Sequence, residues 1–375
     1  MMTVNEIATP AYVVYEDRLR RNLRLITDVE RRAGVNIIMA FKANALWRTF
    51  PVIAEYNRDF TASSLNELRL GCETLGGEAH SYCPVYTPQT VDEFIARSSH
   101  MTFNSLDQLE RYGLRAKAAG VSTGLRVNPL CSVVDTDIYN PSLPGSRFGV
   151  TADCLPDKLP DYLDGFHFHA LCESSSHDLA KVLQAFEEQF GRWLPSLRWV
   201  NMGGGHLMTR EGYDTDHLVE LLKAFRRRHP NLQVILEPGS AWTWRTGDLL
   251  TTVVDVVENA GISTAIIDAS FACHMPDTLE MPYKPAITES REGAPFVYRL
   301  GGNSCLSGDF MGDWTFDAPL EPGTRLTLED MNHYTTVKTN MFNGISHPDM
   351  VWVDADGECR LLRRFTYEDY KNRMD

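Results

Sequence analysis

The sequence lacks the features that would place the protein in a membrane or in an oxidising compartment. No apolar run approaches the length that spans a bilayer. None of the 8 cysteines forms a C-x-x-C pair, which argues against zinc and disulfide frameworks. The N-terminal stretch MMTVNEIATP has neither the basic flank nor the apolar core of a signal peptide, so we expect a cytoplasmic protein.

The chain also has fewer basic than acidic residues. It contains 36 Lys and Arg and 50 Asp and Glu, which gives a formal net charge of −14. This balance argues against nucleic acid and anionic membranes as partners. It suits a cationic substrate, although an acidic surface more often serves only solubility. The chain has no internal repeat, and its 375 residues are enough for a barrel and a second domain.

Short apolar runs alternate with amphipathic stretches from about Tyr15 to Ala241. The clearest predicted strands are Asn36–Ala40, Ser122–Val127, Gly165–Phe168, Trp199–Met202 and Gln233–Leu236. The clearest predicted helices are Ser64–Leu75, Ser105–Ala119, His177–Phe190 and Thr215–His229. Such a long alternation predicts an α/β barrel or a doubly wound sheet.

The pattern changes after about Trp242, where helical periodicity fades and β-forming residues, Gly and Pro dominate. This composition predicts an all-β region, and the apolar run Ala11–Tyr15 could join it as a further strand. The sequence therefore predicts a barrel over residues 16–243 and a β-domain over residues 244–375. An N-terminal strand segment, residues 1–15, would join that β-domain.

Residues with chemical potential follow several of the predicted strands, and barrel active sites lie at such strand ends. Lys42, in AFKAN, has no carboxylate beside it, so burial would lower its pKa and favour the amine that attacks carbonyl carbons. From local context alone, a lysine that extends from a strand end to solvent fits better. Gly203, Gly204 and Gly205 would let backbone amides approach a phosphate, although a plain tight turn gives the same pattern.

Three further motifs complete this set of candidates. The two histidines of FHFH, His167 and His169, are not expected to chelate one metal, but one imidazole could lie flat against an aromatic ligand. Glu237, in LEPG, could keep a pyridine nitrogen protonated at the barrel mouth, or it could cap a helix or form a salt bridge. Cys305 lies between glycines and could donate a proton, or it could be buried as a small hydrophobe.

Together these groups fit one cofactor, pyridoxal 5′-phosphate, and their order resembles a known family. The chain is similar to the alanine-racemase-fold decarboxylases, which include ornithine, arginine and diaminopimelate decarboxylases. The similarity runs from Thr9-Pro10-Ala11-Tyr12 to Phe342-Asn343-Gly344 and is greatest to the carboxynorspermidine and carboxyspermidine decarboxylase branch. It implies an alanine-racemase-type (β/α)8 barrel with a C-terminal β-domain, no metal, and decarboxylation of a carboxylated polyamine to norspermidine or spermidine.

The resemblance also implies a role for individual residues around the cofactor. Lys42 would carry the cofactor covalently, and Glu237 would pair with its pyridine nitrogen. The remaining cofactor contacts would come from Arg126 and His169 at the ring and from Gly203, Gly204, Gly205 and Tyr334 at the phosphate.

The resemblance implies catalytic and substrate-binding residues as well. Cys305 would act with Lys42 as a catalytic residue, and Arg147, in SRFG, would lie near the substrate carboxylate. Glu173, Asp309 and Asp313 are candidate partners for ammonium groups of the substrate. Cys305 and Asp309 would enter the active site of a second subunit, because this family builds its sites across a homodimer interface.

Departures from the family patterns narrow the substrate. Leu306 follows Cys305 where ornithine-type enzymes have Asp and diaminopimelate enzymes have Glu, and Thr61 stands where ornithine-type enzymes have an acid. Diaminopimelate, ornithine or arginine decarboxylation, amino-acid racemisation and a non-catalytic cofactor carrier remain as alternatives. Carboxynorspermidine and carboxyspermidine differ by one methylene, which is worth only about 1–3 kcal/mol in an apolar pocket, and the sequence does not separate them.

Overall fold

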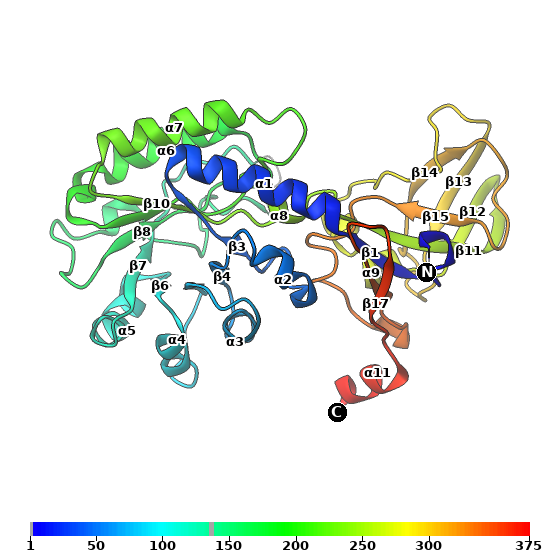
Figure 1. Cartoon of the computed structure of the whole chain (residues 1–375), viewed down its shortest axis with the longest axis horizontal. Coiled ribbons are helices and arrows are strands. Elements are labelled where there is room, and N and C mark those ends of the chain that lie inside the picture. Colours follow the sequence, from blue (N-terminus) through cyan, green and yellow to red (C-terminus); the bar gives the residue numbers. More distant parts are fainter. Residues whose placement is uncertain (1–2, 135–138) are drawn as a thin grey trace. The chain divides into compact units, whose positions relative to one another are not determined.

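The computed structural model describes residues 3–134 and 139–375 (Figure 1). These residues form two compact units. One unit is Arg21–Trp242, and the other combines the chain up to Arg20 with Thr243–Asp375. Among the described residues, no helix is both long enough and apolar enough to traverse a bilayer.

The unit Arg21–Trp242 is built on a parallel sheet with the strand order β2-β10-β9-β8-β7-β6-β5-β4-β3. The strands are β2 Asn36–Ile37, β3 Met39–Ala40, β4 Phe60–Ala62, β5 Ala79–Tyr82, β6 His100–Phe103, β7 Ser122–Arg126, β8 Gly165–His167, β9 Trp199–Asn201 and β10 Gln233–Leu236. The two ends of this order, β2 and β3, belong to one run of chain, and Ile38 between them donates its N–H to the Leu236 carbonyl at 2.9 Å. The sheet is a nearly closed barrel, so the predicted barrel fold is confirmed.

Helices follow most of these strands, and serine side chains mark where several of them begin. The helices are α1 Glu16–Ala33, α2 Phe50–Ile53, α3 Leu65–Thr74, α4 Val91–Arg97, α5 Leu106–Ala118, α6 Ser176–Phe190, α7 Thr215–Arg228 and α8 Ser240–Thr243. Ser64, Ser105 and Ser175 each accept a hydrogen bond from a backbone N–H of the first turn, at 3.2–3.3 Å. Between β7 and β8 the described chain forms a long connection that includes the 3-10 helix Ala152–Cys154.

The N-terminal end of the barrel interior is filled by one large side chain. Trp199 is paired in register with Gly165, which is itself paired with Gly124. A Cβ atom at either glycine would overlap the Trp199 ring. The indole N–H donates to the Ser122 hydroxyl at 2.9 Å. The two glycines are therefore required for Trp199 to occupy this layer.

The second unit is a mixed sheet with the strand order β14-β13-β12-β11-β1-β16-β17, and β15 also pairs with β11. Its strands are β1 Ala11–Tyr15, β11 Gly247–Asn259, β12 Ile262–Ile267, β13 Phe296–Gly301, β14 Phe310–Phe316, β15 Arg325–Leu328, β16 Asp349–Val353 and β17 Cys359–Arg363. Three short helices accompany them, namely α9 Phe271–His274, α10 Asp277–Glu280 and α11 Tyr367–Met374. The N-terminal strand β1 lies in this sheet between β11 and β16, where Ala11 and Val13 join a buried apolar cluster.

Replacing Gly165 by Ala should lower the free energy of unfolding by about 1–3 kcal/mol, because the added methyl group overpacks the barrel against Trp199. Gly191→Ala is the matched control, since nothing lies within 4 Å of a Cβ there. Its effect should stay below about 1 kcal/mol. Urea denaturation of the two variants measures both values, and equal stabilities would contradict the role given to Gly165.

Candidate active site

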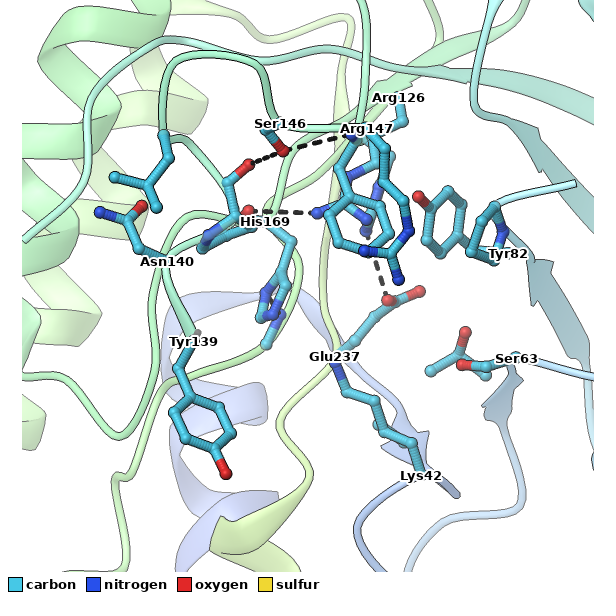
Figure 2. Close-up of a pocket in the computed structure, with 18 of the residues that line it drawn as sticks. Lys42, Ser63, Tyr82, Arg126, Tyr139, Asn140, Ser146, Arg147, His169 and Glu237 are labelled. Carbon is cyan, nitrogen blue, oxygen red and sulfur yellow. Dashed lines mark hydrogen bonds and ion pairs between the residues drawn. The ribbon is translucent and has the colours of Figure 1, made fainter. Parts of the chain in front are cut away.

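A cavity of about 610 Å³ opens at the C-terminal end of the barrel strands (Figure 2). Its walls come from residues at or shortly after the ends of β3, β4, β5, β7, β8, β9 and β10, and from the loop formed by residues 139–148. Figure 2 shows the side chains of Lys42, Arg126, Arg147, His169 and Glu237 gathered around this space. The barrel therefore brings together five residues that the sequence predicted for one site.

Glu237 is a buried carboxylate held by the two neighbouring strands. One oxygen accepts a hydrogen bond from the Asn201 amide at 2.7 Å, and the other lies 3.4 Å from His167 Nε2. Burial alone would raise the pKa of Glu237, but contacts with His167, His80 and Asn201 outweigh it and hold the pKa at about 2. Glu237 is therefore ionised at any physiological pH.

The glycine turn after β9 packs tightly against the turns that follow β8 and β10. Gly203 and Gly205 have φ of +68° and +90°, in the left-handed region that favours glycine. A Cβ at Gly204 would lie 2.5 Å from the Glu237 carbonyl oxygen, and one at Gly205 would overlap Leu171. Asn201 also accepts a hydrogen bond from Gly203 N–H at 2.8 Å, so the side chain that binds Glu237 also holds this turn.

Lys42 and His169 share the cavity and have lowered pKa values. The Lys42 side chain borders the open space of the cavity, but protein atoms surround it. This burial lowers the pKa of Lys42. The positive charge of Arg126 lowers the pKa further, whereas the negative charge of Glu237 raises it. Burial, Lys42 and Arg126 also place the pKa of His169 well below its ordinary value. His169 is neutral as a result, and because Gly204 N–H donates to its Nδ1 at 3.0 Å, the ring proton lies on Nε2.

Arg126 is buried between two aromatic rings at the end of β7. Its guanidinium carbon lies 4.7 Å from the Tyr82 ring centroid and 4.4 Å from that of Phe148. Arg147 contacts Phe148 from the adjacent position, with its guanidinium carbon 4.2 Å from the ring centroid. The described residues of the lining include three basic side chains, Arg126, Arg147 and Lys42, and one carboxylate, that of Glu237. Because basic groups outnumber acidic ones, the cavity is suited to an anionic ligand.

Asn104, just after β6, ties the cavity loop to the barrel. Its amide donates to the Arg147 carbonyl at 2.8 Å, and its oxygen accepts from Gly149 N–H at 3.0 Å. The same oxygen accepts from the Tyr82 hydroxyl at 2.8 Å. Asn104 therefore holds the backbone on both sides of Phe148 and the ring of Tyr82, the two aromatic groups that enclose Arg126.

Glu173 lies outside the described lining of the cavity. It follows β8 with φ of +46°, and its carboxylate accepts a hydrogen bond from the Ser240 hydroxyl at 3.3 Å. Its predicted contact with substrate stays a prediction.

The other predicted residues belong to the sheet unit. Cys305 is exposed, and its backbone N–H donates to the Asn343 side chain at 2.8 Å. Asp313, on β14, lies 3.3 Å from Arg299 Nε. Tyr334 has φ of +53°, and its ring packs edge-on against His333 with centroids 6.3 Å apart. The roles predicted for these residues stay predictions.

Asp309 has surroundings that the sequence did not indicate. It is only 4% exposed, and it accepts hydrogen bonds from the Ser270 hydroxyl at 2.8 Å, Ala272 N–H at 2.9 Å and Ser304 N–H at 3.1 Å. A carboxylate with three donors is engaged within its own chain. These contacts favour a role in shaping the loop that carries Cys305 over the predicted contact with a substrate ammonium group.

Several side chains that position the cavity residues were not predicted from the sequence. His167 was named in the FHFH motif and Asn201 lies in the predicted strand Trp199–Met202, but neither was assigned to Glu237. Tyr82 and Asn104 were not singled out, because the short strands β5 and β6 contain too many polar residues to read as apolar runs. The alternation around Ala79–Tyr82 was the one available indication of an inward-facing Tyr82.

Replacing Asn104 by Ala should loosen the cavity loop without unfolding the barrel. We expect hydrogen exchange at the Gly149 amide to accelerate about fivefold, because a net hydrogen bond of about 1 kcal/mol is lost. The Val150 amide, which donates to the Arg126 carbonyl at 2.9 Å, is the internal control and should change less. Equal acceleration at both amides would instead indicate general destabilisation.

Comparison with known proteins agrees with this geometry. Residues 13–332 match a family model whose description is pyridoxal-dependent decarboxylase, C-terminal sheet domain. The chain is 46% identical to a carboxyaminopropylagmatine decarboxylase of Synechocystis, over 99% of this chain and 96% of that protein. It is 38% identical to a carboxynorspermidine/carboxyspermidine decarboxylase of Campylobacter jejuni, over 99% and 100% of the two chains.

A solved structure gives the same result. The crystal structure of carboxynorspermidine decarboxylase from Campylobacter jejuni, complexed with norspermidine, superposes with a TM-score of 0.90 at 37% identity. The superposition covers 98% of this chain and 100% of that one. The resemblance inferred from the sequence motifs is confirmed, and the chain belongs to the pyridoxal-dependent decarboxylase family.

Proposed function

We propose that this decarboxylase removes the carboxyl group of a carboxylated polyamine, with pyridoxal 5′-phosphate held on Lys42 in the barrel cavity. The observation that carries the proposal is the presence of Lys42 and Glu237 in one cavity. Lys42 has a lowered pKa and Glu237 has a pKa of about 2. A reactive amine and a permanently charged acid are the two groups that a pyridine aldehyde cofactor requires.

The residues of the cavity fit this cofactor. Glu237 would keep the pyridine nitrogen protonated, and the neutral ring of His169 would stack on the pyridine face. Gly204 lines the cavity with no side chain, and a Cβ there would collide with the Glu237 carbonyl, so the wall remains open to a phosphate. When bound, the cofactor supplies a ring that accepts electrons from the bond to the departing carboxylate.

The chain's own residues would then assist the breaking of one bond and the transfer of one proton. The bond between the α-carbon and the carboxylate breaks, carbon dioxide leaves, and a proton takes its place on the α-carbon. Arg147, in the cavity wall, would orient the carboxylate before it leaves. Cys305 would deliver the proton, and the Lys42 amine would displace the product.

We further propose that Cys305 reaches this cavity from a second copy of the chain. Leu306 and Phe310, on either side of the loop that carries Asp309, are apolar yet 45% and 42% exposed, as expected of a surface that another subunit covers. Glu237 is the one carboxylate among the described lining residues, and it is committed to His167 and Asn201. The distal cationic groups of a polyamine therefore need acids from outside this wall, which a second copy would supply.

The named relatives act on related carboxylated amines, and their identities to this chain separate polyamine substrates from diaminopimelate. The relative at 46% identity is a carboxyaminopropylagmatine decarboxylase, whereas those at 38% and 35% are carboxynorspermidine/carboxyspermidine decarboxylases. Diaminopimelate decarboxylases match at 24%. The identities favour a polyamine substrate over diaminopimelate, with carboxyaminopropylagmatine as the second candidate beside carboxynorspermidine and carboxyspermidine.

The protein reconstituted with pyridoxal 5′-phosphate should show a visible absorption band that Lys42→Ala lacks. It should release carbon dioxide and the corresponding amine from carboxynorspermidine, carboxyspermidine or carboxyaminopropylagmatine. Steady-state kcat/KM on these three, beside diaminopimelate, ornithine and arginine, ranks the substrates. Preferred turnover of diaminopimelate, ornithine or arginine would refute the polyamine assignment, and an unchanged band in Lys42→Ala would refute the role of Lys42.

Cys305→Ala should lower kcat by about 10²–10⁴-fold, the range for loss of a positioned proton donor. The matched control is Cys154→Ala, which removes another exposed thiol, on the barrel unit. This control should retain wild-type kcat and product. If Cys305→Ala also released the normal amine at the wild-type rate, another group would have to protonate the α-carbon.

A further inference from the structure

We propose that Glu78, His80 and His100 form a binding site for a transition-metal ion of the Zn²⁺ class. The site lies at the N-terminal end of the barrel strands, whereas the cavity residues follow the C-terminal ends. Among the described residues these three form a cluster whose ligand atoms, one carboxylate oxygen and two imidazole nitrogens, all lie within 4.8 Å of one another.

Parallel strand pairing brings the three residues together. His80 and His100 are direct partners in the ladder between β5 and β6, so their side chains lie on the same side of the sheet. Their rings are stacked with centroids 4.0 Å apart. Glu78 stands two positions before His80, and its backbone N–H donates to the Asp59 carboxylate at 2.8 Å, which holds this entry to β5.

No hydrogen bond in the described part of the chain engages the His80 ring, the Glu78 carboxylate or His100 Nε2. His80 is only 7% exposed, and the structure gives its ring nitrogens no hydrogen bond to any residue it describes. The Glu78 carboxylate likewise has no ion pair or hydrogen bond in that part of the chain. His100 uses Nδ1 in a hydrogen bond with the Ser99 hydroxyl at 3.0 Å, which leaves Nε2 for a ligand.

The local charge also bears on a cation. The Asp59 carboxylate, which accepts the Glu78 backbone N–H at 2.8 Å, adds negative charge beside the cluster. Asp164 also lies within electrostatic range of His100, but it is paired with Lys117 and Arg198.

Two imidazoles and one carboxylate are a known donor set for zinc, with water as the fourth ligand. Two imidazoles that are stacked nearly parallel cannot both direct a nitrogen lone pair at one ion, so the rings must tilt out of their stack to bind it. Glu78 is exposed, and its side chain has room to follow. The ion would join β5 to β6 and so stabilise the folded barrel.

The test uses the cofactor-loaded protein, stripped with EDTA, desalted and titrated with Zn²⁺ by calorimetry and with Co²⁺ by visible absorption. We expect about one bound equivalent, a Co²⁺ spectrum without thiolate bands, and a rise in the melting temperature with Zn²⁺. Glu78→Gln and His100→Gln should each weaken binding by at least about tenfold and abolish the thermal shift.

A second stacked histidine pair supplies the matched control. The rings of His177 and His217 also lie 4.0 Å apart, on α6 and α7, so His177→Gln removes an imidazole from a similar pair. This variant should bind Zn²⁺ like the wild type. Absence of binding by the wild type, or equal binding by Glu78→Gln and the wild type, would overturn the proposal. Because Glu78 is exposed, its variant folds independently of any packing role of His80.

Discussion

A buried carboxylate that must remain charged is the constraint on which the barrel site depends. Burial of Glu237 opposes its ionisation, and the two side chains that contact its carboxylate, the Asn201 amide and the His167 ring, favour the charged form. These partners come from β9 and β8 and face Glu237 because His167 and Asn201 are paired in register. A shift of β8 by one residue would turn the His167 side chain away from Glu237 and remove one of the two partners of its carboxylate.

The same network sets the shape of the cavity wall. Asn201 binds Glu237 with its amide nitrogen and Gly203 N–H with its oxygen, so the acid and the glycine turn move together. Gly204 in turn donates to His169, which fixes the orientation and the proton position of that ring. Asn104 performs a similar function on the opposite side, where it holds the loop that encloses Arg126. Amide side chains thereby position the charged groups.

Where residue patterns were strong, the sequence predicted the elements well. The helices α3, α5, α6 and α7 and the strands β7 to β10 lie within one residue of their predicted bounds. The strands β4, β5 and β6 were missed because their inward faces carry polar side chains such as Thr61, His80 and Thr102. A short strand with a polar interior face has no apolar run, and its alternation spans too few residues to identify it. The residues on and beside these strands were missed for the same reason.

The sequence by itself determined the chemical groups and their order along the chain. Lys42, the glycine turn and Glu237 each follow an apolar strand. Such local patterns can be recognised in the sequence without knowing the fold. Tertiary structure alone decided which groups meet. His167 meets Glu237 across a distance of 70 residues in sequence, and the pairing of β5 with β6 stacks His80 on His100. These contacts follow from barrel closure and strand register, and no local pattern encodes a partner on another strand.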